Sequence, residues 1–247
     1  MIDPNSPILL YRGISVEPNE EDRIRDQILS NGIQAEGYDA TRTYVLHCCL
    51  QSQIEAFDEA CRLSLKNLVE QSEDSDSYPA FAACGDEAGG SYYAVEHNRS
   101  EENGHTCPLV IKFTTEIKNV QVNYESFLNL AMSARSVGNG PLQGEYLEKF
   151  YGPKIRLYWK SIQRGTQQIA AVALASQDLE VIEAHAQNQF ALLGKRHVIS
   201  ASEFLVRSPV PAKNIVSVSA PGIFSFKHDF SLRNLHDLGT RHYKGTV

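Results

Sequence analysis

The sequence predicts a single α+β domain in which helices flank a central, mostly antiparallel β-sheet. Short apolar runs rich in β-branched residues, bounded by glycine or proline, recur along the chain and are typical of strands. Between them lie longer segments whose apolar residues recur every three or four positions, as in helices that pack on a sheet. The 247 residues, 42% of them hydrophobic, can bury one sizeable core. We expect one domain over 1–247, with a core at about 8–226 and a polar tail at 228–247.

The first part of the chain predicts one strand and two helices. The apolar run at 8–12 is typical of a buried strand, and Gly13 ends it. An acidic first turn, apolar residues at helical spacing and Gly32 as the C-cap predict a helix over 20–31. Apolar residues at steps of three and four predict a second helix over 51–71.

Strands and helices alternate through the rest of the chain. Further predicted strands share β-branched or apolar runs, and they lie at 78–85, 107–115, 119–123, 197–206 and 214–226. One helix is predicted to begin near Asp86, and others to cover 124–135 and the alanine-rich segment 169–191. The glycine-rich stretch 137–146 predicts a loop.

Composition and motifs exclude several classes of function. A net charge of −7 argues against binding nucleic acid through broad charge attraction, and no apolar run approaches the 18 residues of a membrane span. The five cysteines and eight histidines show no metal-ligand spacing, so we expect reduced thiols, no metal and a cytoplasmic protein. Phosphate-loop, dinucleotide-fold and serine-hydrolase motifs are also absent. Cys48 or Cys49 acting as a nucleophile with a distant histidine remains an alternative.

Three blocks of sequence, in this order, carry a family resemblance. The first is LLYRGIS followed by a helix and NGI, the second is YPAFAACGDEAGGSYYA, and the third is SASEFLVRSPVPAKNIVSV. Together they resemble the motifs of ADP-ribosyltransferases, in particular the arginine- and glutamate-containing mono-ADP-ribosyltransferase toxins. The resemblance covers about residues 8–220. It implies a split antiparallel sheet, NAD as the substrate and transfer of ADP-ribose to a macromolecule, with NAD hydrolysis as a side activity.

The resemblance assigns roles that the chemistry of the reaction explains. Glu203 would be catalytic, because a carboxylate stabilises the oxocarbenium-like centre that forms when nicotinamide leaves ribose. Arg12, followed by Gly13, would bind the NAD phosphates, because a guanidinium can hold them in a two-pronged contact. Tyr92 or Tyr93 would stack on nicotinamide, and the sequence leaves open which of them does so.

Two departures from the family pattern bear on the acceptor. Where the family has a serine motif, this chain has Ala82-Ala83-Cys84, and Ala201 stands where arginine-modifying members carry an acidic or amide side chain. Modification of arginine is therefore disfavoured. Lys195 and Arg196, just before Glu203, are the predicted acceptor-binding residues and favour a nucleic acid. A basic and aromatic set of residues is either a second surface, for single-stranded nucleic acid, or a solvated helix or hairpin face; it consists of Lys149, Tyr151, Lys154, Arg156, Tyr158, Trp159, Lys160 and Arg164.

The alternatives to nucleic-acid modification are modification of a protein side chain other than arginine and an NAD-binding module that has lost catalysis. The related tRNA 2′-phosphotransferase chemistry is a further alternative, for which only the first block is suggestive. The predicted partners are NAD, the macromolecular acceptor and an inhibitory protein of the kind that restrains a toxin; no membrane is implied. An injected effector is the alternative to a toxin that acts in its own cytoplasm.

Overall fold

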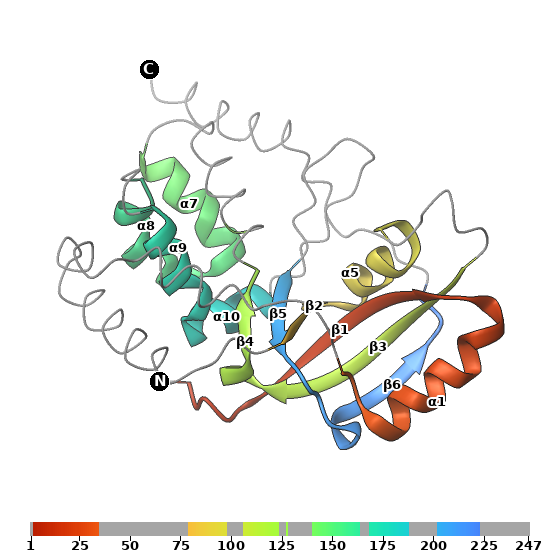
Figure 1. The fold of residues 1–247 in the computed structure, drawn as a ribbon. Helices are drawn as coiled ribbons and strands as arrows, with labels where there is room; N and C mark the ends of the chain where they lie inside the picture. Colours follow the sequence, from red (N-terminus) through yellow and green to blue (C-terminus); the bar gives the residue numbers. More distant parts are fainter. Residues whose placement is uncertain are drawn as a thin grey trace.

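The computed structural model describes residues 2–34, 79–97, 106–123, 127, 140–163, 168–187 and 202–222. These residues form a mixed α+β structure built on an antiparallel sheet of six strands, in the order β4-β5-β2-β1-β3-β6 (Figure 1). The strands are β1 Pro7–Val16, β2 Ala80–Cys84, β3 Cys107–Glu116, β4 Val120–Val122, β5 Glu203–Arg207 and β6 Ile215–Ser219. The α+β class and the mostly antiparallel sheet that the sequence predicts are confirmed.

The sheet consists of two halves that meet at one pair of residues. β1 pairs with β3 along its whole length, from Pro7 opposite Glu116 to Val16 opposite Cys107. β2 pairs with β5 along its whole length as well. Between the halves, β1 and β2 pair only where Tyr11 lies opposite Cys84. The strands on either side of this junction diverge, which leaves backbone groups there to be bound by side chains.

Helices cover the sheet unevenly (Figure 1). Their bounds are α1 Glu21–Asn31, α5 Glu87–Tyr92, α7 Gly140–Tyr151, α8 Arg156–Gln163, α9 Gln168–Gln177 and α10 Leu179–Gln187. The last four gather beside β4, α1 packs against β6, and α5 lies over β1 and β3. A π-helical turn, Tyr93–His97, follows α5 directly and also packs on β1.

The core connects both halves of the sheet. The rings of Phe81 in β2 and Phe113 in β3 are 5.7 Å apart, so aromatic contact bridges the two halves. On the helical side, the ring of His185 in α10 lies between Tyr151, at 4.7 Å, and Phe204 of β5, at 5.1 Å. All five side chains are buried. The packing of His185 against Tyr151 and Phe204 holds α10 and the start of β5 together.

Local sequence signals account for two helix ends. The helix α1 ends at Gly32, which has φ of 80° and whose N–H donates to the carbonyl of Ile28, as expected for a glycine C-cap. Asp86 caps α5, because its Oδ1 accepts a hydrogen bond of 2.7 Å from the N–H of Gly89. Both predictions are confirmed.

Two predicted elements differ from the structure. The glycine-rich stretch 137–146 was expected to be a loop, but α7 begins at Gly140, and its buried Leu147 and Phe150 bind it to the core. The single helix expected over 169–191 is two helices that break at Asp178. The Asp178 carboxylate accepts hydrogen bonds from the N–H of Glu180 and from the hydroxyl of Tyr158, so it starts a new helix instead of continuing the old one.

The strands near the C-terminus are shorter within the described residues than predicted. The structure describes β5 from Glu203, and β6 ends at Ser219. The predicted helix 51–71, most of 124–135, and the tail 228–247 lie outside the described residues. Among the helices that the structure describes, none has the length and apolar character needed to cross a membrane.

Candidate functional site around Glu203

Glu203 lies at the junction of the two sheet halves. It opens β5 and pairs with Cys84, which in turn pairs with Tyr11 of β1. Its side chain is partly buried. Paired residues of antiparallel strands project from the same face, so Tyr11, Cys84 and Glu203 share one face of the sheet.

The two oxygens of the Glu203 carboxylate accept hydrogen bonds from different segments. The hydroxyl of Tyr93 donates a hydrogen bond to Oε1. The side-chain nitrogen Nδ2 of Asn123, the residue after β4, lies 3.5 Å from Oε2 in a longer bond. The backbone N–H of Asn123 also donates to the backbone carbonyl of Glu203, at 2.8 Å. The carboxylate is therefore held from two sides.

The structure distinguishes the two tyrosines of the middle block. Tyr93, in the π-helical turn, reaches Glu203, and Tyr92 packs edge-on against it with the ring centroids 5.4 Å apart. Burial raises the pKa of Tyr93 most, and the negative charge of Glu203 and the hydrogen bond to it raise it further, well above its ordinary value of 10. Tyr93 therefore stays protonated and acts as a donor at neutral pH.

The thiol of Cys84 lies within the electrostatic reach of both predicted key residues. Burial raises its pKa most, the charges of Glu203 and Asp86 raise it further, and Arg12 lowers it. The net effect is upward, so this thiol is protonated and is a poor nucleophile. Both charges act on this one group, so Arg12 and Glu203 lie near the same junction. Arg12 follows Tyr11 in β1, so its side chain leaves the strand on the face opposite to that of Glu203, which is the face of Phe81.

Arg12 reaches across the gap where β1 and β2 diverge. Its Nη1 donates to the backbone carbonyl of Ala82, at 2.9 Å, and its guanidinium carbon lies 4.9 Å from the centre of the Phe81 ring. The position of the guanidinium is thus set by a carbonyl of β2 and by a cation–π contact. Arg12 therefore joins the two halves of the sheet as well as bringing a positive charge to the junction.

The predicted cofactor residue Gly13 has a packing role. A Cβ at this position would lie 2.1 Å from the carbonyl oxygen of Gly90 and 2.4 Å from the backbone nitrogen of Ala94. Only glycine lets α5 and the π-helical turn approach β1 this closely. This approach brings Tyr93 to Glu203.

Of the two predicted acceptor surfaces, the structure describes most of the second and none of the first. Lys195 and Arg196 lie outside the described residues. In the second predicted surface, Tyr151, Tyr158 and Trp159 are buried, so they cannot stack on bases, and that part of the prediction is wrong. Two of its cations form ion pairs with carboxylates, Lys154 with Glu180 and Arg156 with Glu148. Helix packing explains why these aromatic residues recur at this spacing.

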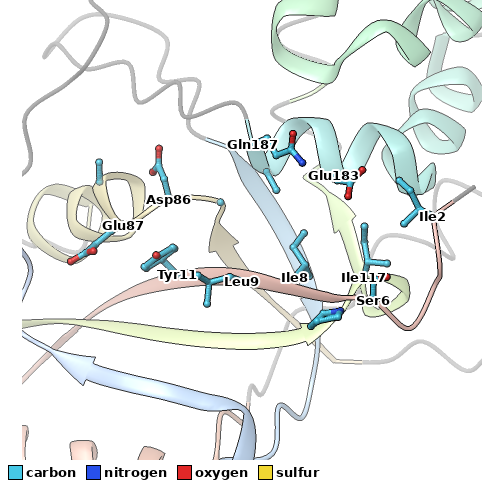
Figure 2. A pocket seen from close by; sticks show the side chains of 14 residues that line it. Ile2, Ser6, Ile8, Leu9, Tyr11, Asp86, Glu87, Ile117, Glu183 and Gln187 are labelled. Atoms are coloured by element: carbon cyan, nitrogen blue, oxygen red, sulfur yellow. The ribbon is translucent and has the colours of Figure 1, made fainter.

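A cavity of about 610 Å³ lies beside the junction, between α5 and α10 (Figure 2). Tyr11 and Leu9 of β1 form part of its floor, and its carboxylates are those of Asp86, Glu87 and Glu183. Arg12, Glu203, Tyr92 and Tyr93 are not among the described residues that line it. The three carboxylates among its described lining residues disfavour a phosphate group there, so we expect the NAD diphosphate to bind elsewhere.

Comparisons of the chain with protein-family models, with curated proteins and with solved structures found no match. Within the described part of the chain, no group of three or more His, Cys, Asp or Glu side chains is arranged to hold a metal ion.

Sequence reasoning missed one member of the site, Asn123. The pattern at 119–123 indicates only a short strand, and its partner Glu203 lies 80 positions further along the chain. An amide directly after a strand is the one signal available, and many such residues are ordinary turn residues.

Proposed function

We propose that this chain transfers ADP-ribose from NAD to a macromolecular acceptor, with Glu203 as the catalytic carboxylate. The observation that carries the proposal is a carboxylate fixed at the junction of a split antiparallel sheet, in a region that also contains the charge of Arg12. The strand order and the single pair between β1 and β2 support the finer proposal of an ADP-ribosyltransferase-like fold.

The proposed reaction needs a fixed negative charge. The bond between ribose and nicotinamide breaks, and its electron pair leaves with nicotinamide. The ribose carbon becomes positively charged and is stabilised by Glu203. A nucleophilic atom of the acceptor then forms the new bond to ribose and releases a proton. A carboxylate held by two donors is oriented before the charge develops, which is the condition for effective stabilisation.

Arg12 is proposed to contact the NAD phosphates. A guanidinium is planar and always charged, and its anchoring by the carbonyl of Ala82 aligns it before NAD binds. The Arg12→Lys variant should bind NAD more weakly, because an ammonium group cannot reproduce a two-pronged contact. Isothermal titration with NAD measures this, and an unchanged affinity would count against Arg12 as the phosphate ligand.

The proposed acceptor is nucleic acid, with Lys195 and Arg196 holding its phosphates, and a toxin-like role in its own cell follows from that choice. A protein side chain other than arginine is the alternative acceptor. If the proposal is right, replacing both residues by alanine lowers transfer but spares NAD hydrolysis, and transfer falls steeply with salt. A shallow salt response, with label that resists nuclease and yields to protease, would instead identify a protein acceptor.

A second candidate function is NAD binding without turnover. The observation that favours it is the stretch Ala82-Ala83-Cys84 in β2, which has no hydroxyl group and whose thiol has a raised pKa. Such a module would bind NAD, and it would release no nicotinamide.

The deciding experiment incubates the purified protein with NAD labelled in the adenine ring and with cell lysate, and measures nicotinamide release and label transfer. Glu203→Gln keeps the shape of the side chain and removes its charge, so both activities should fall by about a hundredfold or more. Glu116→Gln is the matched control, because this exposed carboxylate at the end of β3 forms a surface ion pair with Lys118 and does not contact the site. Full activity in Glu203→Gln would refute the assignment.

A further inference from the structure

The orientation of Glu203 depends on residues outside the strands that flank it. Its neighbour in the sheet is Cys84, a weak hydrogen-bond donor, preceded by two alanines. A carboxylate at this junction needs stronger donors if it is to keep one orientation. The structure supplies a phenol hydroxyl from the π-helical turn and, at the longer distance of 3.5 Å, an amide from the end of β4.

The two donors are complementary in geometry. Tyr93 donates to one carboxylate oxygen and Asn123 to the other, so rotation of the carboxylate would break at least one of these bonds. Asn123 is tied to the same residue through its backbone, which donates to the carbonyl of Glu203. The amide side chain is therefore held at a constant distance from the strand that carries Glu203.

Tyr93 is held in place by the packing of its turn. The next residue, Ala94, is buried, and its backbone would be only 2.4 Å from a Cβ on Gly13. The ring of Tyr92 packs edge-on against Tyr93 from the other side. Single π-helical turns often occur at functional sites, where they redirect one side chain. Here the redirected side chain meets Glu203.

Resting on the proposed transferase function, we propose that Tyr93 and Asn123 are positioning residues, which orient the Glu203 carboxylate toward the ribose of NAD. This role differs from the stacking on nicotinamide that the resemblance implies for a tyrosine here. In stacking, the ring acts and the hydroxyl is dispensable. In positioning, the hydroxyl is essential.

The two roles separate in the Tyr93→Phe variant, which keeps the ring and removes the hydroxyl. Positioning predicts that kcat falls about ten- to a hundredfold, whereas KM for NAD changes little, because a misoriented carboxylate affects the transition state more than binding. Asn123→Ala should show the same split.

The acid limb of the pH dependence of kcat should move to higher pH in both variants, because each lost donor favours the charged carboxylate. Among the described residues, the other ionisable groups around this unit include Tyr11, Cys84, Asp86, Arg12 and Tyr92, and all remain in both variants.

Matched controls exist elsewhere in the chain. Tyr158→Phe removes another tyrosine–carboxylate hydrogen bond, to Asp178, and Asn214→Ala removes another asparagine side-chain bond, to the carbonyl of Thr114. Both controls should lower stability, measured by thermal unfolding, and leave the pH dependence of kcat unchanged.

The outcomes distinguish the inference from the function on which it rests. A wild-type protein that releases no nicotinamide from NAD overturns the proposed function and the inference with it. Turnover by the wild type, with wild-type kcat and pH dependence in both Tyr93→Phe and Asn123→Ala, overturns the inference alone. A rise in KM for NAD without loss of kcat in Tyr93→Phe also overturns it and points to a direct contact with the cofactor. Reduced kcat with a shifted acid limb in both variants, but in neither control, supports it.

Discussion

Burial of His185 should make the fold sensitive to acid. The side chain is 3% exposed and lies between Tyr151 and Phe204, and its Nδ1 is 2.9 Å from the carbonyl oxygen of Phe150. A carbonyl only accepts, so Nδ1 carries the proton in the neutral ring. Burial lowers the pKa from 6.5 to about 4, although the bond to Phe150 acts in the opposite direction.

The lowered pKa determines the pH range in which stability is lost. Between about pH 6.5 and 4 the unfolded chain binds a proton on His185 that the folded protein does not bind. The contribution to stability is therefore complete above pH 6.5 and is lost as the pH falls toward 4. At about 1.36 kcal/mol for each pKa unit, the loss amounts to about 3 kcal/mol.

Urea unfolding from pH 7.5 to 4 measures this loss. In His185→Gln, whose amide can still donate to the carbonyl of Phe150, the free energy of unfolding should fall by about 3 kcal/mol less over this range than in the wild type. Exposed carboxylates titrate in both proteins, so their effect on the free energy of unfolding cancels in the difference between the two. Equal losses in the two proteins would refute the reasoning.

The site around Glu203 should also be affected by protonation of His185, because the hydroxyl of Ser202, next to Glu203, donates to the backbone carbonyl of His185 at 2.8 Å.

Two further predictions test the packing of the site. Gly13→Ala should lower the free energy of unfolding by about 1–3 kcal/mol or prevent folding, because the new methyl group meets backbone atoms of α5 and the π-helical turn that cannot move aside. The midpoint of urea unfolding measures this change. A midpoint equal to that of the wild type would contradict the prediction. Cys84 should react with a thiol reagent such as iodoacetamide far more slowly in the folded protein than in urea at the same pH, because it is buried and its pKa is raised. Mass spectrometry of the labelled peptide gives the two rates. Equal rates would show that the thiol is accessible in the folded protein.

Elements specified by neighbouring residues could be predicted from the sequence. Gly32 ends α1 because a left-handed backbone conformation suits glycine, and Asp86 begins α5 because its carboxylate caps a free N–H. The strand at 107–116 follows from its β-branched and aromatic residues. In each case the physical cause lies within a few positions of the residue concerned.

Features that depend on distant partners could not be predicted in the same way. The bond between Tyr93 and Glu203 joins residues 110 positions apart, and that between Asn123 and Glu203 joins residues 80 positions apart. The break at Asp178 depends on the hydroxyl of Tyr158, which arrives from another helix. The glycines in 137–146 predict a loop, because glycine disfavours a helix locally. Burial of the last turns of α7 in the core outweighs this local preference.

The charges near the site restrict how a polyanionic acceptor can approach Glu203. The cavity beside the junction carries three carboxylates, which repel phosphates and are screened only beyond about 8 Å at physiological salt. If the acceptor is the proposed nucleic acid, we expect its phosphates to approach from another side. Lys195 and Arg196 precede Glu203 by eight and seven positions in the sequence. As the proposed acceptor contacts, they would offer a polyanion the positive charge that the described lining of the cavity lacks.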